Sequence, residues 1–68
     1  MKNNLKKYRE GLGYSQIEFA KMLHVKQAYL SKLENNNLKE IPAEVFKNIR
    51  EIDSNADIPY IMGISALL

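Results

Sequence analysis

The apolar positions near the start of the chain recur at helical spacing. Leu5, Tyr8 and Leu12 follow one another at intervals of three and four residues, with Asn3 or Asn4 ahead of them as a possible N-cap. Residues at these intervals share one side of an α-helix. Glycines at 11 and 13 bracket the end of the pattern, which therefore predicts a first helix over about residues 4–10.

Two further helical patterns meet in residues 15–35, "SQIEFAKMLHVKQAYLSKLEN". Ser15 precedes Glu18 by three residues, which is the capping-box spacing, and predicts that a second helix begins directly after Ser15. A third pattern starts at Gln27, only a short step after His24 and Val25. The inward residues expected of these two helices are Phe19, Ala20, Leu23, Leu30 and Leu33. The sequence thus predicts two helices joined by a tight corner.

Two more helices are predicted after the asparagine run 35–37, which suits a helix end. Pro42 is suited to the first turn of a fourth helix, whose apolar stripe would be Val45, Phe46, Ile49 and Ile52. A short fifth helix would be capped by Asp57 or Ile58, with Pro59 at its first position. Its expected inward residues and end are Tyr60, Ile61 and Gly63. No segment has the pattern of a strand, so the predicted fold class is all-α.

Length and composition place these helices in one small domain. The chain has 68 residues and no cysteine, so neither a disulfide nor a thiolate metal site can reinforce it, and packing must supply its stability. The longest apolar stretch, residues 58–68, is too short to span a bilayer. The start, "MKNNLKKYREG", has lysines but no apolar run behind them, which is unlike a signal peptide. We therefore expect a cytoplasmic protein with no membrane contact.

Charge is unevenly distributed along the chain. Residues 1–39 carry eight basic and three acidic side chains, a formal charge of +5, whereas residues 40–68 carry two basic and five acidic ones, a formal charge of −3. A solvated surface with a chance bias would give the same count. The alternative is that the first half of the chain meets a polyanion.

The residues needed for catalysis are missing from the sequence. His24 is the only histidine, and without cysteine it lacks the companions that a zinc or catalytic site requires. We find no nucleophile–base pair, no glycine-rich phosphate loop and no carboxylate cluster at metal spacing. The expectation is a protein that is not an enzyme and that has neither metal nor cofactor.

The helical pair over residues 16–35 resembles the Cro/C1-type (Xre) helix-turn-helix family of DNA-binding repressors. Ala20 stands where the family needs a small residue between the two helices, and Val25, Leu30 and Leu33 stand at its buried positions. "LSKLEN" is similar to the end of the family's recognition helix, and "IPYIMG" to its last helix. The resemblance covers residues 5–63. It implies a compact five-helix, lambda-repressor-like domain whose second and third helices form the DNA-binding unit.

The resemblance also implies structural roles for particular residues. The family often pairs an arginine on the first helix with a glutamate near the end of the third, which here are Arg9 and Glu34. His24 occupies a turn position where glycine is usual and a left-handed backbone is expected. Lys26 replaces the usual serine or threonine cap of the third helix, and Asn36 replaces another frequent glycine.

A DNA-binding role would assign the polar face of the third helix to the major groove. Gln27 has an amide that can pair with adenine, and Ala28 is small enough to contact a thymine methyl. Ser31 and Lys32, one turn further on, are the other expected base contacts. The expected phosphate contacts are Gln16, Lys26, Tyr29, Asn37 and Lys39. In the phage repressors that the sequence resembles, glutamines at the positions of Gln16 and Gln27 act together.

The sequence-based interpretation is therefore a helix-turn-helix transcription regulator, expected to be a repressor, that is bacterial or phage-encoded and associated with the nucleoid. Residues 1–63 would be the DNA-binding domain and residues 64–68 an apolar tail. The apolar residues Ile58, Ile61, Met62, Ile64, Leu67 and Leu68 suggest a homodimer contact and hence a pseudo-palindromic operator. The alternatives are that the tail folds back over its own domain, and that the fold serves protein contact, as in an antitoxin or co-activator module.

Overall fold

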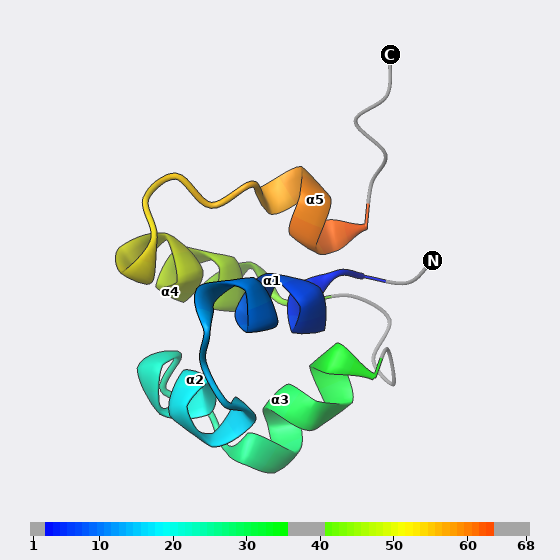
Figure 1. The fold of residues 1–68 in the computed structure, drawn as a ribbon, viewed down its shortest axis with the longest axis vertical. Coiled ribbons are helices and arrows are strands. Elements are labelled where there is room, and N and C mark those ends of the chain that lie inside the picture. The colour runs from blue at the N-terminus through cyan, green and yellow to red at the C-terminus, as the bar shows by residue number, and fades with distance from the viewer. Residues whose placement is uncertain (1–2, 36–40, 64–68) are drawn as a thin grey trace.

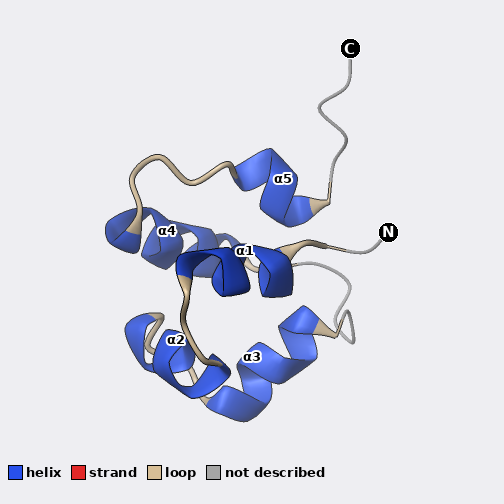
Figure 2. Ribbon diagram, viewed as in Figure 1, coloured by secondary structure: helices blue, strands red, loops and turns tan. Residues whose placement is uncertain are grey.

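A computed structural model describes residues 3–35 and 41–63 of the chain. These residues form five α-helices and no strand, which confirms the predicted all-α class (Figure 2). The helices are α1 (Leu5–Leu12), α2 (Gln16–Met22), α3 (Gln27–Glu34), α4 (Ala43–Ile52) and α5 (Ile58–Met62).

Helix α1 lies in the middle of the molecule, with the α2–α3 pair on one side of it and α5 on the other (Figure 1). α1 contacts both α3 and α5, while α2 packs against α3. Asn4, just before α1, fastens the two ends of the described chain together. Its backbone N–H donates to the carbonyl of Ile61 at 2.9 Å, and its side-chain amide donates to the carbonyl of Tyr60 at 2.9 Å.

A single core is built from apolar residues of all five helices and of the segments between α3 and α5. The buried residues are Leu5, Phe19, Ala20, Leu23, Leu30, Leu33, Ile41, Val45, Ile49, Ala56 and Ile61. The inward positions predicted for α2 and α3 are all among them, and Val25 packs against this core as a partly buried residue. Fully burying one large aliphatic or aromatic side chain is worth about 1.5–3 kcal/mol, so this core is the main source of stability in a chain without crosslinks.

The start of α2 has the predicted capping box. The Ser15 hydroxyl accepts the Glu18 backbone N–H at 3.1 Å, and the Glu18 carboxylate accepts the Ser15 backbone N–H at 2.9 Å. The hydrogen bond from the Ser15 backbone lowers the pKa of the Glu18 carboxyl, because it favours the ionised form. Asp57 caps α5 in the same local manner, its carboxylate accepting the Tyr60 N–H at 3.2 Å.

The corner between α2 and α3 turns at His24, whose φ of 61° is the expected left-handed conformation. The Val25 N–H donates to the Ala20 carbonyl at 3.0 Å and the His24 N–H to the Lys21 carbonyl at 3.2 Å. Together these bonds form a Schellman motif, which ends α2 and reverses the chain. The side-chain amide of Asn48 in α4 donates to the Leu23 carbonyl at 3.0 Å, so α4 holds the corner from behind.

Several predicted details are wrong. α1 ends between the two glycines, as predicted, but its last residue is Leu12, two positions beyond the predicted bound, and Gly13 follows as the C-cap with a φ of 86°. Leu12, the last residue of α1, is 38% exposed, whereas Leu5 and Arg9 are buried. Tyr60 is 42% exposed, because the inward side of α5 is formed by the buried Ile61 and the partly buried Ile58.

Both prolines sit one position away from the places predicted for them. Pro42 lies one residue before α4, as its N-cap, and not in its first turn. Pro59 is the second residue of α5, which begins at Ile58. Each proline still occupies a helix start, where its missing backbone donor is not needed.

Within residues 3–35 and 41–63, no helix has the length and apolar character that crossing a membrane requires.

Candidate nucleic-acid interface

Helix α3 has two chemically different sides. Leu30 and Leu33 are buried in the core, whereas Gln27, Ala28 and Lys32 are exposed. Ser31, partly exposed, lies four residues after Gln27 and so shares its side of the helix. The four residues predicted to contact bases, Gln27, Ala28, Ser31 and Lys32, therefore lie on the side of α3 away from the core.

The first residues of α2 and α3 are joined through their side chains. Gln16 opens α2 and Gln27 opens α3. The amide nitrogen of Gln27 donates to the amide oxygen of Gln16 at 3.3 Å. The tight corner at His24 brings the starts of both helices to one place, as the action of these two glutamines in the resembling repressors implied.

Behind the glutamines lies an ion pair between α1 and α3. Arg9 Nε donates to Glu34 Oε2 at 2.7 Å, and the terminal Nη2 donates to Oε1 at 3.2 Å. The third donor, Nη1, reaches the carbonyl of Tyr14 at 2.8 Å. The Arg9 and Glu34 side chains are only 9% and 1% exposed. The hydrogen bond to Glu34 is the main cause that raises the pKa of Arg9.

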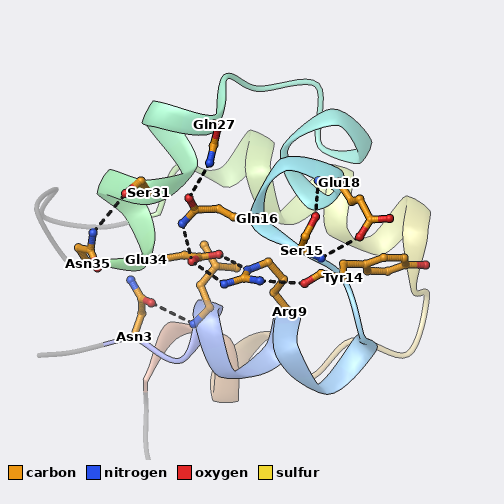
Figure 3. Close-up of polar contacts among 11 residues, drawn as sticks. Asn3, Arg9, Tyr14, Ser15, Gln16, Glu18, Gln27, Ser31, Glu34 and Asn35 are labelled. Carbon is orange, nitrogen blue, oxygen red and sulfur yellow. Dashed lines mark hydrogen bonds and ion pairs between the residues drawn. The ribbon is translucent and has the colours of Figure 1, made fainter.

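Gln16 connects this ion pair to the surface of α3. Its amide nitrogen donates to Glu34 Oε1 at 3.0 Å, while its amide oxygen accepts from Gln27. The hydrogen bonds thus run without interruption from Arg9 through Glu34 and Gln16 to Gln27 (Figure 3). An exposed side chain at the start of α3 is thereby fastened to a buried charge pair.

A second connection between α1 and α3 comes from Asn3. Its side-chain nitrogen donates to the carbonyl of Leu33 at 2.9 Å, and its oxygen accepts the Leu5 backbone N–H at 3.0 Å. One asparagine therefore caps α1 and binds the last turn of α3. Together with Arg9, it fixes the orientation of α3 relative to the core.

The residues predicted to contact phosphates are placed as follows. Lys26, which replaces the family's usual serine or threonine cap, is exposed at the N-cap of α3 and makes no capping hydrogen bond through its side chain. Tyr29 is partly buried and packs against the core. Asn37 and Lys39, like the departure at Asn36, lie outside the described residues.

Sequence reasoning missed three contacts of this region. It treated Asn3 only as a possible cap and gave Asn48 no role. It also did not connect Gln16 with Glu34, which lies 18 residues away. The sequence signal for Asn48 is its place directly before Ile49 of the apolar stripe of α4, and the structure shows that it is partly buried.

The described residues contain no group of three or more histidine, aspartate or glutamate side chains positioned to hold a metal ion.

Comparison with known protein families gives one result. The model of the family described as helix-turn-helix matches residues 5–52, which includes α1 to α4. No curated protein and no solved structure matches the chain.

Proposed function

The chain belongs to the Cro/C1-type helix-turn-helix family of DNA-binding transcription regulators, and on this premise we propose that it is a repressor that binds double-stranded DNA in a sequence-specific manner. In this proposal α3 enters the major groove and α2 lies across the backbone. The family is a regulatory one and not typically enzymatic.

The observation that carries the proposal is the support given to Gln27. A side chain that reads a base edge must reach the groove in a fixed position. Gln27 is exposed at the start of α3, yet its amide is held by Gln16, which in turn is held by the buried Glu34. A merely solvated glutamine on a helix surface needs no such support.

The base contacts would come from four residues of α3. The amide of Gln27 offers a donor and an acceptor, the combination that adenine requires. Ala28 is exposed and small enough to approach a thymine methyl, and Ser31 and Lys32 lie one turn further along the same helix. These are direct contacts to base edges, and they would determine the choice of sequence.

The phosphate contacts would come from the start of α2, from the start and first turn of α3, and from the segment after α3. We assign them to Gln16, Lys26, Tyr29, Asn37 and Lys39. Contacts of this kind position the protein on the duplex without selecting sequence. The positive charge of residues 1–39 supports this assignment, because it favours approach to a polyanion.

We further propose that the protein acts in the cytoplasm as a homodimer formed through its C-terminal end, with residues 1–63 as the DNA-binding domain. Of the predicted contact residues, Ile61 is wholly buried in its own core and is not available, whereas Met62 is 43% exposed. Ile58 is partly buried, and Ile64, Leu67 and Leu68 lie outside the described residues. A two-fold dimer would match a pseudo-palindromic operator.

The proposed function is tested by selecting duplexes that bind the protein from a random pool, followed by affinity measurements on the enriched sequence and on a scrambled one. We expect a common motif and tighter binding to it. Absence of duplex binding even at low salt would favour the rival function, a helix-turn-helix fold used for protein contact.

A further inference from the structure

We propose that Glu34 is a specificity-determining positioning residue. Through Gln16, Glu34 fixes which end of the Gln27 amide faces Gln16. The orientation of the amide then lets Gln27 bind adenine and discriminate against guanine. The inference rests on the proposed function, because it concerns the same surface of α3. It adds a buried residue that touches no DNA to those that decide which base is read.

The first step is the hydrogen-bonding capacity of Glu34. An ionised carboxylate only accepts hydrogen bonds. Both oxygens of Glu34 accept from Arg9, and Oε1 also accepts from Gln16 at 3.0 Å. An amide has a donating nitrogen at one end and an accepting oxygen at the other, so Gln16 can satisfy this carboxylate only by presenting its nitrogen.

The second step follows at Gln16. With its nitrogen turned to Glu34, its oxygen is the end that remains for Gln27 (Figure 3). That oxygen only accepts, so Gln27 must present its own nitrogen, as it does at 3.3 Å. The carboxylate has thereby set the direction of two successive amides.

The third step is the chemistry of the bases. One of the two hydrogens on the Gln27 nitrogen is used by Gln16, which leaves one hydrogen and the carbonyl oxygen for DNA. Adenine offers one acceptor and one donor in the major groove, which fits this pair. Guanine offers two acceptors, so the Gln27 oxygen would face an acceptor without a hydrogen between them.

The test uses the complete chain and a panel of duplexes that differ at one base pair. That base pair is the one whose preference is lost in Gln27→Ala. There we expect the wild type to prefer adenine over guanine by about 5-fold to 150-fold, the range for a bidentate contact. Glu34→Gln keeps the shape of the side chain, but the new amide can donate as well as accept hydrogen bonds. The amides of Gln16 and Gln27 can then both reverse. Gln16→Met removes the hydrogen bonds that connect Glu34 with Gln27 while leaving the Arg9–Glu34 pair intact. This variant provides the test if Glu34→Gln does not fold.

We expect both variants to reduce the adenine preference to below about threefold, because both hydrogens of Gln27 become available to guanine. Glu51→Gln, which removes an exposed carboxylate on α4, is the matched control for the change in charge and should keep the wild-type preference.

A second readout needs no DNA. In ¹⁵N-labelled free protein, one side-chain amide hydrogen of Gln27 should exchange more slowly than the other, and both variants should abolish the difference.

The outcomes separate the inference from the function on which it rests. If the wild type binds duplex DNA without sequence preference, or if Gln27→Ala changes no preference, the proposed function of α3 fails. If Gln27 controls a base pair but folded Gln16→Met and Glu34→Gln keep the wild-type adenine preference, only the role of Glu34 is overturned. A wild-type preference for guanine at that base pair would also overturn it.

Discussion

Arg9 and Glu34 lie together between α1 and α3, with Arg9 Nε 2.7 Å from Glu34 Oε2 and both side chains almost wholly buried. The guanidinium contacts Glu34 through Nε and Nη2 and the carbonyl of Tyr14 through Nη1. The pair does not act as a surface charge. It links the first helix to the helix proposed to read DNA.

We expect Arg9→Ala to destabilise the domain strongly. Removing one partner of a buried pair leaves the other charge uncompensated and costs about 3–5 kcal/mol. For a domain of this size, that loss corresponds to a fall in melting temperature of more than about 10 °C. Thermal unfolding followed by circular dichroism measures it. Lys7→Ala, an exposed cation on the same helix, is the control and should change little. Equal melting temperatures for Arg9→Ala and wild type would show that the pair contributes nothing.

A pH-dependent loss of stability is expected from Tyr8. Burial raises the pKa of its phenol above the ordinary 10.0, and the hydrogen bond it donates to Asp53 at 2.9 Å adds to the rise. The folded state then holds this proton more tightly than the unfolded state. The stabilisation that Tyr8 contributes is therefore fully present below about pH 10 and is lost as the pH rises further. We compare melting temperatures between pH 9 and 11, about one unit on each side of the ordinary pKa of tyrosine. The melting temperature of Tyr8→Phe should fall less over this range than that of wild type. Tyr60→Phe, at an exposed tyrosine, should follow the wild-type curve; parallel curves for Tyr8→Phe and wild type would refute the assignment.

Features that depend on neighbouring residues could be predicted from the sequence. The Ser15–Glu18 capping box joins residues three apart. The left-handed turn at His24 is local as well, but it was expected only from the family resemblance. The inward positions of α2 and α3 also followed from helical spacing. On each helix the apolar residues recur on one side, and this side packs into the core.

Features that depend on the placement of whole helices could not be predicted in this way. The contacts Gln16–Glu34, Asn48–Leu23 and Asn3–Leu33 join residues 18, 25 and 30 positions apart. Spacing does not show which side of a short helix is buried, so Tyr60 was misplaced. The Arg9–Glu34 contact was expected only because of the family resemblance.

DNA binding should depend steeply on salt. Each phosphate neutralised contributes about −0.9 to the slope of log affinity against log salt. Lys39→Ala should weaken binding to all sequences about equally and flatten the slope by about 0.9, because Lys39 is assigned to a phosphate. Lys32→Ala should do the same only if Lys32 contacts a phosphate in place of the base edge proposed for it. Fluorescence anisotropy over a salt series measures this, with Lys47→Ala on α4 as the matched cation outside the proposed interface. A slope near zero for the wild type would contradict electrostatic binding.

The proposed homodimer should be visible by sedimentation equilibrium, both free and on a duplex with two half-sites. We expect dimers, and we expect Met62→Lys to weaken them, because Met62 is an exposed apolar residue beside the C-terminal end. The half-sites should be about one helical turn, roughly 34–36 Å, apart. Ile17→Lys changes an exposed apolar residue on α2, away from this end, and is the control. A wild type that stays monomeric at high concentration in both settings would exclude the dimer.

The most direct test of the central claim, that α3 reads DNA through Gln27, is the affinity of Gln27→Ala for a panel of single-base variants of the selected duplex. We expect a loss of about 1–3 kcal/mol on the preferred sequence and a relaxed choice at one base pair only. Gln16→Ala should weaken all sequences through the loss of its phosphate contact and, like Gln16→Met, should also lower the adenine preference at that base pair; the two substitutions should be non-additive because the side chains share a hydrogen bond. If Gln27→Ala leaves the ranking of the variants as it is in the wild type, Gln27 does not read the sequence.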